Sequence, residues 1–291
     1  MQIRNKVARY AAMGCAWLIT SVGANASPVL DELRQGGKLR IAYRESSVPF
    51  SYLGANNKPI GYALDLCLKV ADVLRKQPGL QGLGIEWIPA TPGNRIALME
   101  QGKAHLECGS TTNNAERRHK VAFTIPHFIT GARLLVRADS KVTRIEDLEG
   151  KTPLKAAEQA NRERLLRITI AQAADHARAV EMIEKGEADA FVMDDVLLYG
   201  LAANRPDPSA LKVVGKFITT EPLAIMLPKN DPDFKKLVDD EMRRLIHSRE
   251  IFAIYDQWFA QPIAPANTAL NMPVSYLLRD FWKYPTDQVP F

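Results

Sequence analysis

A group of hydroxyl side chains stands just ahead of an arginine near the middle of the chain. Ser110, Thr111 and Thr112 lie in the run ECGSTTNNAER at 107–117, and Arg117 follows Thr112 by five residues. A guanidinium group binds a carboxylate through two parallel charge-assisted hydrogen bonds, and hydroxyl and backbone N–H groups at a strand-to-helix turn complete the shell. The run therefore predicts a binding site for a small carboxylate. The alternative is a cluster that caps a helix, with Arg117 in solvent.

A second arginine, Arg44, opens the segment RESSVPFSY at 44–52 and follows the strand-like run LRIAY at 39–43. Ser110 likewise follows a predicted strand at 105–108. In an open α/β sheet, ligands bind outside the carboxyl ends of the strands. We therefore expect Arg44 and Ser110 at one edge of a sheet, facing a common cleft.

Patterns typical of catalysis or metal binding are poorly represented. The chain has no G-x-S-x-G and no H-E-x-x-H pattern, and the tripeptide GKT at 150–152 lacks the upstream glycine of a P-loop. The five histidines have no metal-ligand spacing. Asp194 and Asp195 are adjacent, so their side chains point apart, and a helix N-terminus favours acids for its own reasons. We expect no catalytic residue, no metal and no cofactor.

The first 26 residues have the composition of a secretory signal. Arg4, Lys6 and Arg9 precede an apolar run at 10–22, and an A-x-A cleavage site follows at 24–26. The apolar run is too short to span a bilayer comfortably, which argues against the alternative of an uncleaved anchor. We predict cleavage after Ala26 and export to the periplasm.

The charge of the mature chain excludes one class of partner. Cleavage would remove three basic and no acidic residues, leaving 35 Lys and Arg against 33 Asp and Glu. The mature protein would be nearly neutral, so the sequence pI near 9.0 is no argument for nucleic-acid or membrane binding. We expect a soluble monomer that binds no nucleic acid.

Two of the three cysteines would remain after export. Cys15 would leave with the signal, and no convincing lipoprotein box precedes it. Cys67 and Cys108 would stay in an oxidising compartment, where two cysteines allow one intramolecular bond. We predict a disulfide between them. The alternative is a pair of buried thiols that pack as small hydrophobic side chains.

Strand-like and helix-like runs alternate along the chain, which is the pattern of an α/β architecture. Strands are predicted at 38–43, 84–88, 105–108, 132–137, 152–156, 188–193 and 222–227. Helices are predicted at 62–76, 93–102, 113–119, 144–149, 161–168, 176–185, 194–203, 232–247 and 249–259. The proline-containing tail at 261–291 is expected to lie draped over the surface.

Longer segments carry a similarity to a known family: RESSVPFSY at 44–52, GYALDLCLKV at 61–70, GNRIALMEQGKAHLECGSTTNNAER at 93–117, FVMDDVLL at 191–198 and DQWFAQPIAP at 256–265. The chain resembles family 3 of the bacterial extracellular solute-binding proteins, most closely the periplasmic glutamate/aspartate-binding components of ABC importers. The resemblance covers nearly the whole mature chain and is weakest at 152–175. It implies a type II periplasmic binding protein, with two α/β lobes joined by two crossing strands and the ligand in the cleft.

The resemblance also implies a division of the chain. The crossings would fall near 131–136 and 221–227. Lobe 1 would then comprise 27–130 and 228–291, including the tail, and lobe 2 would comprise 131–227. The implied function is capture of glutamate or aspartate by lobe closure and delivery to inner-membrane ABC permease subunits.

One set of site residues, carried over from the family, would hold the ligand's α-amino-acid end. Arg117 matches the arginine that binds the α-carboxylate, with Ser110 and Thr112 beside it. Asp194 matches the acid that meets the α-ammonium group. The alternative for Asp194 is a residue that caps a helix.

A second set would surround the distal carboxylate. Arg44, Arg95 and His176 match the basic residues at that end of glutamate/aspartate binders. Such cations explain selectivity, because a neutral side chain would leave buried positive charges unpaired. The alternatives are surface arginines at 44 and 95 and a helix-cap residue at 176.

Two departures from the family pattern bear on the ligand. The G-T-T turn of the relatives aligns with EQAN at 158–161, where Ala160 replaces the hydroxyl residue, and Pro92 replaces a serine. Each lost hydrogen bond to a charged ligand is worth roughly 1.5 to 3 kcal/mol. Backbone N–H groups at the start of the 161–168 helix would compensate, whereas Glu158 would repel an anionic ligand if it faced the cleft. Three alternatives stay open: the same fold with another dicarboxylate or a polar amino acid, an enzyme resembling the periplasmic cyclohexadienyl dehydratases, and a module that presents ligand to a membrane sensor.

Overall fold

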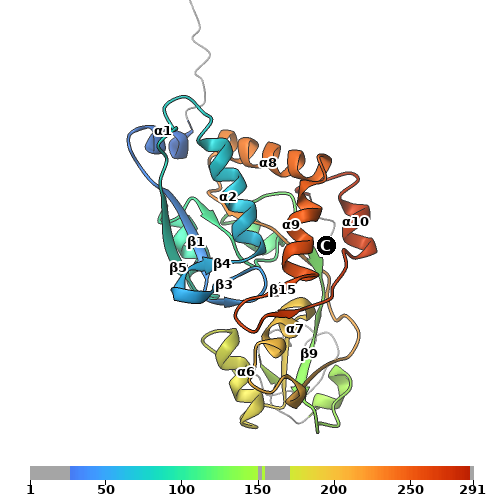
Figure 1. Cartoon of the computed structure of the whole chain (residues 1–291). Helices are drawn as coiled ribbons and strands as arrows, with labels where there is room; N and C mark the ends of the chain where they lie inside the picture. Colours follow the sequence, from blue (N-terminus) through green and yellow to red (C-terminus); the bar gives the residue numbers. More distant parts are fainter. Residues whose placement is uncertain (1–26, 150–152, 155–170, 289–291) are drawn as a thin grey trace, which may run out of the picture.

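The computed structural model describes residues 27–149, 153–154 and 171–288. In these ranges the chain forms two α/β lobes, one above the other in Figure 1, each built around its own sheet. The predicted signal at 1–26 and the predicted helix at 161–168 lie outside the described residues. No helix in the described ranges has the length and apolar character that crossing a membrane requires.

The upper lobe contains a five-stranded sheet. Its strand order is β5 (Ile85–Ala90), β1 (Leu39–Arg44), β6 (Leu106–Glu107), β14 (Met226–Leu227) and β7 (Ala122–Phe123). Strands β5, β1 and β6 are parallel, whereas β14 runs antiparallel to β6 and β7. The helices of this lobe are α1 (Pro28–Arg34), α2 (Tyr62–Leu74), α3 (Arg95–Glu100), α4 (Ala115–Arg118), α8 (Pro232–His247) and α9 (Glu250–Phe259). The sheet therefore unites segments that precede and follow the lower lobe in sequence.

Helix α8 shows how the charged run at 233–250 is accommodated. Asp231 caps the helix by accepting a hydrogen bond from the Phe234 N–H at 2.9 Å, and Pro232 occupies the first helical position. Phe234, Val238 and Leu245 are buried, whereas the opposite face carries exposed ion pairs. The helix predicted at 232–247 is confirmed with the same bounds.

The lower lobe contains a four-stranded sheet. Its strand order is β10 (Pro153–Leu154), β11 (Ala190–Asp194), β9 (Ala132–Arg137) and β12 (Leu211–Val214), with β9 antiparallel to β11 and β12. Helices α6 (His176–Glu184) and α7 (Asp195–Ala203) belong to this lobe. Separate apolar clusters, one around Leu134 and one around Leu135, show that β9 is buried on both faces.

Two short strands connect the lobes. β8 (Phe128–Thr130) and β13 (Glu221–Leu223) pair antiparallel, with Thr130 opposite Glu221. The first connecting strand therefore lies a few residues before the crossing predicted near 131–136. Residues 132–137 form β9, which pairs within the lower sheet.

Smaller elements complete the chain. They are β2 (Ser46–Ser47), β3 (Ser51–Leu53), β4 (Pro59–Ile60), β15 (Pro262–Ile263), β16 (Thr268–Ala269), α10 (Tyr276–Phe281) and the 3₁₀ turns η1 (Ala55–Asn57), η2 (Ile145–Leu148) and η3 (Pro208–Ala210). The helix predicted at 144–149 is thus a 3₁₀ turn of four residues.

The tail lies along the surface as expected, because most of its described residues at 261–288 are exposed, but a few buried side chains anchor it. Helix α10 buries Leu278, and Trp282 after it is also buried. Asn113 donates a hydrogen bond from Nδ2 to the Asp287 carbonyl at 3.2 Å, which ties the tail to the hydroxyl-rich loop. These buried apolar side chains anchor the segment on the upper lobe. They were not recognised in the sequence, because the prolines suggested an irregular tail.

Candidate functional site

A cavity of about 350 Å³ lies between the two lobes. Its walls come from the ends of strands and the starts of helices in both lobes. The lining residues are Pro92, Arg95, Ser110, Thr112, Asn114, Arg117, Ala132, Ala173, Asp175, His176, Ala179, Phe191, Met193, Asp194, Thr219 and Glu221. Six of the seven predicted ligand-binding residues are in this set, and Arg44 is not.

The upper wall follows from the parallel strands of the upper sheet. Arg44 is the last residue of β1, Glu107 is the last residue of β6, and the segment after β5 leads to Arg95 at the start of α3. Because β5, β1 and β6 are parallel, their carboxyl ends meet at one edge. The expected grouping of Arg44 and the loop of Ser110 at this edge is confirmed.

Arg117 is held in place by its own loop. Asn114 caps α4 by accepting a hydrogen bond from the Arg117 N–H at 2.9 Å, and Arg117 Nη1 donates to the Thr112 carbonyl at 2.9 Å. Asn114, and not one of the hydroxyl residues at 110–112, is therefore the residue that caps this helix. Ser110 and Thr112 are left to line the cavity, and the buried Ser110 Oγ has no hydrogen-bond partner.

Arg95 presents a buried guanidinium to the cavity. Its side chain is 8 % exposed and its Nε has no hydrogen-bond partner. Burial lowers the pKa of Arg95 to about 9; Glu107 and Asp194 oppose this shift, whereas the cations Arg117 and Arg44 add to it. A group that is charged at neutral pH, buried and incompletely paired favours an anionic ligand.

Arg44 lies behind the cavity wall. It is 1 % exposed, and Nε and Nη1 have no hydrogen-bond partner. Burial lowers its pKa, and the carboxylates of Glu107 and Asp175 oppose that shift. Arg44 therefore acts on the cavity as a buried positive charge, and its predicted direct contact with a ligand stays a prediction.

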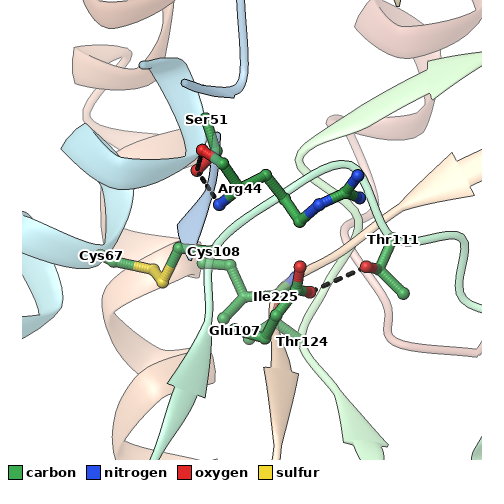
Figure 2. The surroundings of a disulfide bond; sticks show 8 residues. All are labelled: Arg44, Ser51, Cys67, Glu107, Cys108, Thr111, Thr124 and Ile225. Carbon is green, nitrogen blue, oxygen red and sulfur yellow. Dashed lines mark hydrogen bonds between the residues drawn. A yellow bond between two sulfur atoms is a disulfide. The ribbon is translucent and has the colours of Figure 1, made fainter. Parts of the chain in front are cut away.

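Glu107 is a site residue that the sequence analysis did not single out. Its side chain is fully buried, its Oε2 accepts a hydrogen bond from Thr111 Oγ1 at 2.8 Å, and its Oε1 has no partner. Figure 2 shows Glu107 beside Thr111, with Arg44 on the neighbouring strand. The sequence signal that could have identified it is an acidic residue at the end of a predicted strand, directly before the run that ends in Arg117.

Figure 2 also shows the sulfur atoms of Cys67 and Cys108 joined, and Cys108 directly follows Glu107 in the chain. The bond links α2 to the residue after β6, and the two Cα atoms are 6.4 Å apart. This Cα–Cα distance lies within the usual range for a disulfide. Formation of the bond in the exported protein stays a prediction.

His176 contributes from the lower lobe at the first position of α6. Burial lowers its pKa well below the usual value, and the charges of Arg44 and Arg95 lower it further. Its Nδ1 lies 3.3 Å from Ser47 Oγ. The imidazole is therefore neutral at pH 7 in this arrangement and offers a hydrogen bond, not the third cation that the sequence suggested.

Asp194 ends β11 and faces the cavity from the lower lobe. It occupies the cap position of α7, yet its side chain makes no capping hydrogen bond, and Oδ2 has no partner. Burial raises its pKa to about 8, and the neighbouring carboxylates of Glu221 and Asp195 contribute to the rise. A cation placed here would be bound by Asp194 and would lower its pKa again.

The site charges therefore differ between the two walls. Arg95 and Arg117 line the upper wall, whereas Asp175, Asp194 and Glu221 line the lower one. The residues that the structure describes contain no group of three or more His, Cys, Asp or Glu side chains suited to a metal ion.

Comparison with known proteins agrees with this geometry. Residues 39–261 match the sequence profile of the bacterial extracellular solute-binding proteins, family 3. The chain belongs to this family. It is 38 % identical over 269 residues to an L-glutamate/L-aspartate-binding protein of Pseudomonas aeruginosa, which covers 89 % of each chain. It is 36 % identical over 271 residues to a glutamate/aspartate import solute-binding protein of Salmonella typhimurium, which covers 90 % of each chain.

The family fold is also seen in solved structures. A mutant of ArgBP from T. maritima superposes with a TM-score of 0.71, at 23 % identity, over 80 % of this chain and 99 % of that chain. The predicted type II periplasmic binding protein fold is therefore confirmed.

The remaining predictions fall partly outside the described residues. The departure at 158–161, including Glu158 and Ala160, cannot be placed on the cavity wall, because these residues are not described. Pro92 does line the cavity and offers no N–H donor. Asp175, Thr219 and Glu221 are lining residues that the sequence analysis missed, because they reach the site only through the packing of the two lobes.

Proposed function

We propose that this protein is the periplasmic substrate-binding component of an amino-acid ABC transporter, and that it captures glutamate or aspartate between its lobes. One observation carries the proposal. Buried polar atoms without partners converge on one cavity with opposite charges: Arg95 Nε and Ser110 Oγ on one side, and Asp194 Oδ2 on the other. An α-amino acid with a second carboxylate has the complementary groups.

In this proposal Arg117 binds the α-carboxylate, with Ser110 and Thr112 beside it, and Asp194 binds the α-ammonium group. Each of these residues lines the cavity. Because Arg117 lies in the upper lobe and Asp194 in the lower, a ligand that contacts both favours the closed arrangement.

The distal carboxylate is assigned to Arg95 and His176, with the charge of Arg44 behind them. Arg95 supplies a cation, and the neutral imidazole supplies one hydrogen bond. Glutamine would leave the Arg95 charge unpaired, so we expect it to bind more weakly than glutamate.

The domain division, cleavage after Ala26, a monomeric state and delivery to inner-membrane permease subunits are parts of the same proposal. The pairing of β8 with β13 supports lobe boundaries close to residues 130 and 221, a few residues before the boundary at 227 that the family resemblance implies, because β14 already pairs in the upper sheet. The similarity to solute-binding relatives supports a binding role without catalysis.

The test is calorimetric titration of unfolded, ligand-stripped and refolded protein with the common amino acids and dicarboxylates. We expect one site that prefers glutamate or aspartate. Arg117→Ala should weaken every amino acid by at least about 100-fold, because the α-carboxylate is common to all. Arg95→Ala should weaken acidic ligands much more than neutral ones.

The matched control is Arg118→Ala, on the same short helix but outside the cavity lining. It should leave binding unchanged. Glutamine or lysine binding as tightly as both acids would refute the distal-carboxylate assignment. A dicarboxylate without an amino group as the preferred ligand would refute the role of Asp194.

A further inference from the structure

Glu107 is unusual because a fully buried carboxylate stands among the cations of a site proposed to bind carboxylates. It opposes the burial-induced lowering of the pKa of both Arg44 and Arg95, so its charge acts on both guanidinium groups. Its Oε1 has no hydrogen-bond partner, although the side chain is fully buried. A buried charge of this kind is costly unless nearby opposite charges compensate it.

The local backbone is built to admit this carboxylate. A Cβ atom at Gly109 would lie 2.5 Å from Glu107 Oε1 and 3.0 Å from Arg44 Cγ. The absence of a side chain at Gly109 therefore allows the Glu107 carboxylate and the aliphatic part of Arg44 to pack closely against the backbone of this loop. Thr111 Oγ1 fixes the other carboxylate oxygen at 2.8 Å.

The other charges around Arg44 are accounted for. Asp175 is the second carboxylate that acts on Arg44, but it belongs to the lower lobe and its Oδ1 caps α6 through the Arg178 N–H at 2.8 Å. His176 is neutral there at pH 7. Glu107 is thus the upper lobe's own counter-charge to Arg44 and Arg95.

We propose that Glu107 is a specificity-determining residue. Its negative charge compensates one of the two positive charges of Arg44 and Arg95, and this sets how many ligand carboxylates the distal end of the site accepts. The inference rests on the proposed function and deepens it. With Glu107 ionised, the upper wall keeps positive charge for one distal carboxylate. Without it, the same wall would reject neutral ligands more strongly, because a larger positive charge would stay unpaired.

The test measures the ratio of the Kd for glutamine to the Kd for glutamate. Glu107→Gln preserves the shape and removes the charge, and should raise this ratio by at least about tenfold, the size expected for a unit charge as far as roughly 12 Å away at an effective dielectric constant near 20. Arg44→Gln should lower the ratio, because Glu107 is then uncompensated. Replacing both residues by glutamine should bring the ratio back to within about threefold of the native value.

Two controls separate charge from structure. Thr111→Val removes the hydrogen bond to Glu107 but keeps the carboxylate, and should change the ratio less than Glu107→Gln does. Glu241→Gln changes another buried glutamate, paired with Arg244 on α8 outside the cavity lining, and should leave the ratio unchanged.

An unchanged ratio in folded Glu107→Gln would overturn the inference while leaving the proposed function intact. If Glu107→Gln does not fold, Arg44→Gln is compared with the double variant. Recovery of acid preference in the double variant supports the inference, and no recovery overturns it. A native protein without any preference for acids would overturn the proposed function and the inference together.

Discussion

The upper and lower walls of the cavity hold charges of opposite sign in different ways. The upper wall takes its cations, Arg95 and Arg117, from the short helices α3 and α4, where Asn114, Thr112 and the buried Glu107 hold or compensate them. The lower wall places two of its acids at the starts of helices, where Asp175 is used as a cap and Asp194 is not. The upper wall is therefore organised before a ligand arrives, whereas Asp194 lacks the cation that would keep it ionised.

This difference suggests how selectivity and closure are divided. The upper wall distinguishes ligands by their negative charge, and the lower wall responds to the positive group that almost every amino acid shares. Each of the following predictions changes one wall and leaves the other intact.

The largest effect should come from the disulfide beneath the upper wall. Reduction of a bond between residues separated by 41 positions should lower the free energy of unfolding by on the order of 3 to 4 kcal/mol in the chain-entropy model. Denaturant unfolding with and without reductant measures this. The variant with serine at both Cys67 and Cys108 should not respond to reductant. Recovery of two free thiols per chain from unfolded, unreduced periplasmic protein would contradict the bond.

A smaller effect is expected from Asp194→Asn on the lower wall. It should weaken all α-amino acids by about 10- to 100-fold, because a charged hydrogen bond to the ammonium group is lost. A dicarboxylate that lacks the amino group should be unaffected, as titration of both ligand types would show. The control is Asp195→Asn, whose carboxylate accepts a hydrogen bond from Thr130 Oγ1 at 2.6 Å and lies outside the cavity lining. Equal losses for both ligand types would argue against the assignment of Asp194.

The smallest effect concerns pH. The raised pKa of Asp194, about 8 without ligand, means that its carboxyl group is mostly protonated at pH 7. An ammonium ligand requires the ionised form, so binding should release close to one proton at pH 7, and affinity should rise by up to about tenfold per pH unit below 8. Calorimetry in buffers of different ionisation enthalpy measures the released proton, which should be absent in Asp194→Asn.

The same group affects the stability of the ligand-free protein. The folded-state pKa of Asp194 lies above the ordinary value of 3.8, so the folded state binds more protons than the unfolded chain between these values. The contribution of Asp194 to stability is therefore complete below pH 3.8 and is lost as pH rises through 8. An unfolding free energy with the same pH dependence in Asp194→Asn would show that another group is responsible.

Periodicity and local signals were sufficient for the long elements. The helices predicted at 62–76, 176–185, 232–247 and 249–259 all end within two residues of the observed boundaries. The strand expected at 132–137 has the bounds of β9. Local sequence also predicted that Arg44 and the Ser110 loop share one sheet edge, because parallel strands fix that edge.

Other features depend on contacts between distant segments. Burial between the packed lobes lowers the pKa of His176, and Arg44 and Arg95, far away in sequence, lower it further. Glu107 could not be recognised as a counter-charge until the packing against Arg44 and the close approach at Gly109 were known. Helix α10 was missed because its short apolar pattern gains stability only from packing, including the buried Trp282.

The position of β14 affects the order in which the molecule is assembled during synthesis. This strand separates β6 from β7 in the upper sheet, although residues 124–225 intervene in the sequence. All strands of the lower sheet, between residues 132 and 214, leave the ribosome before Met226 does. The lower sheet can therefore pair while β6 and β7 still have exposed edges, so a nascent chain must be protected from aggregation until β14 has been made.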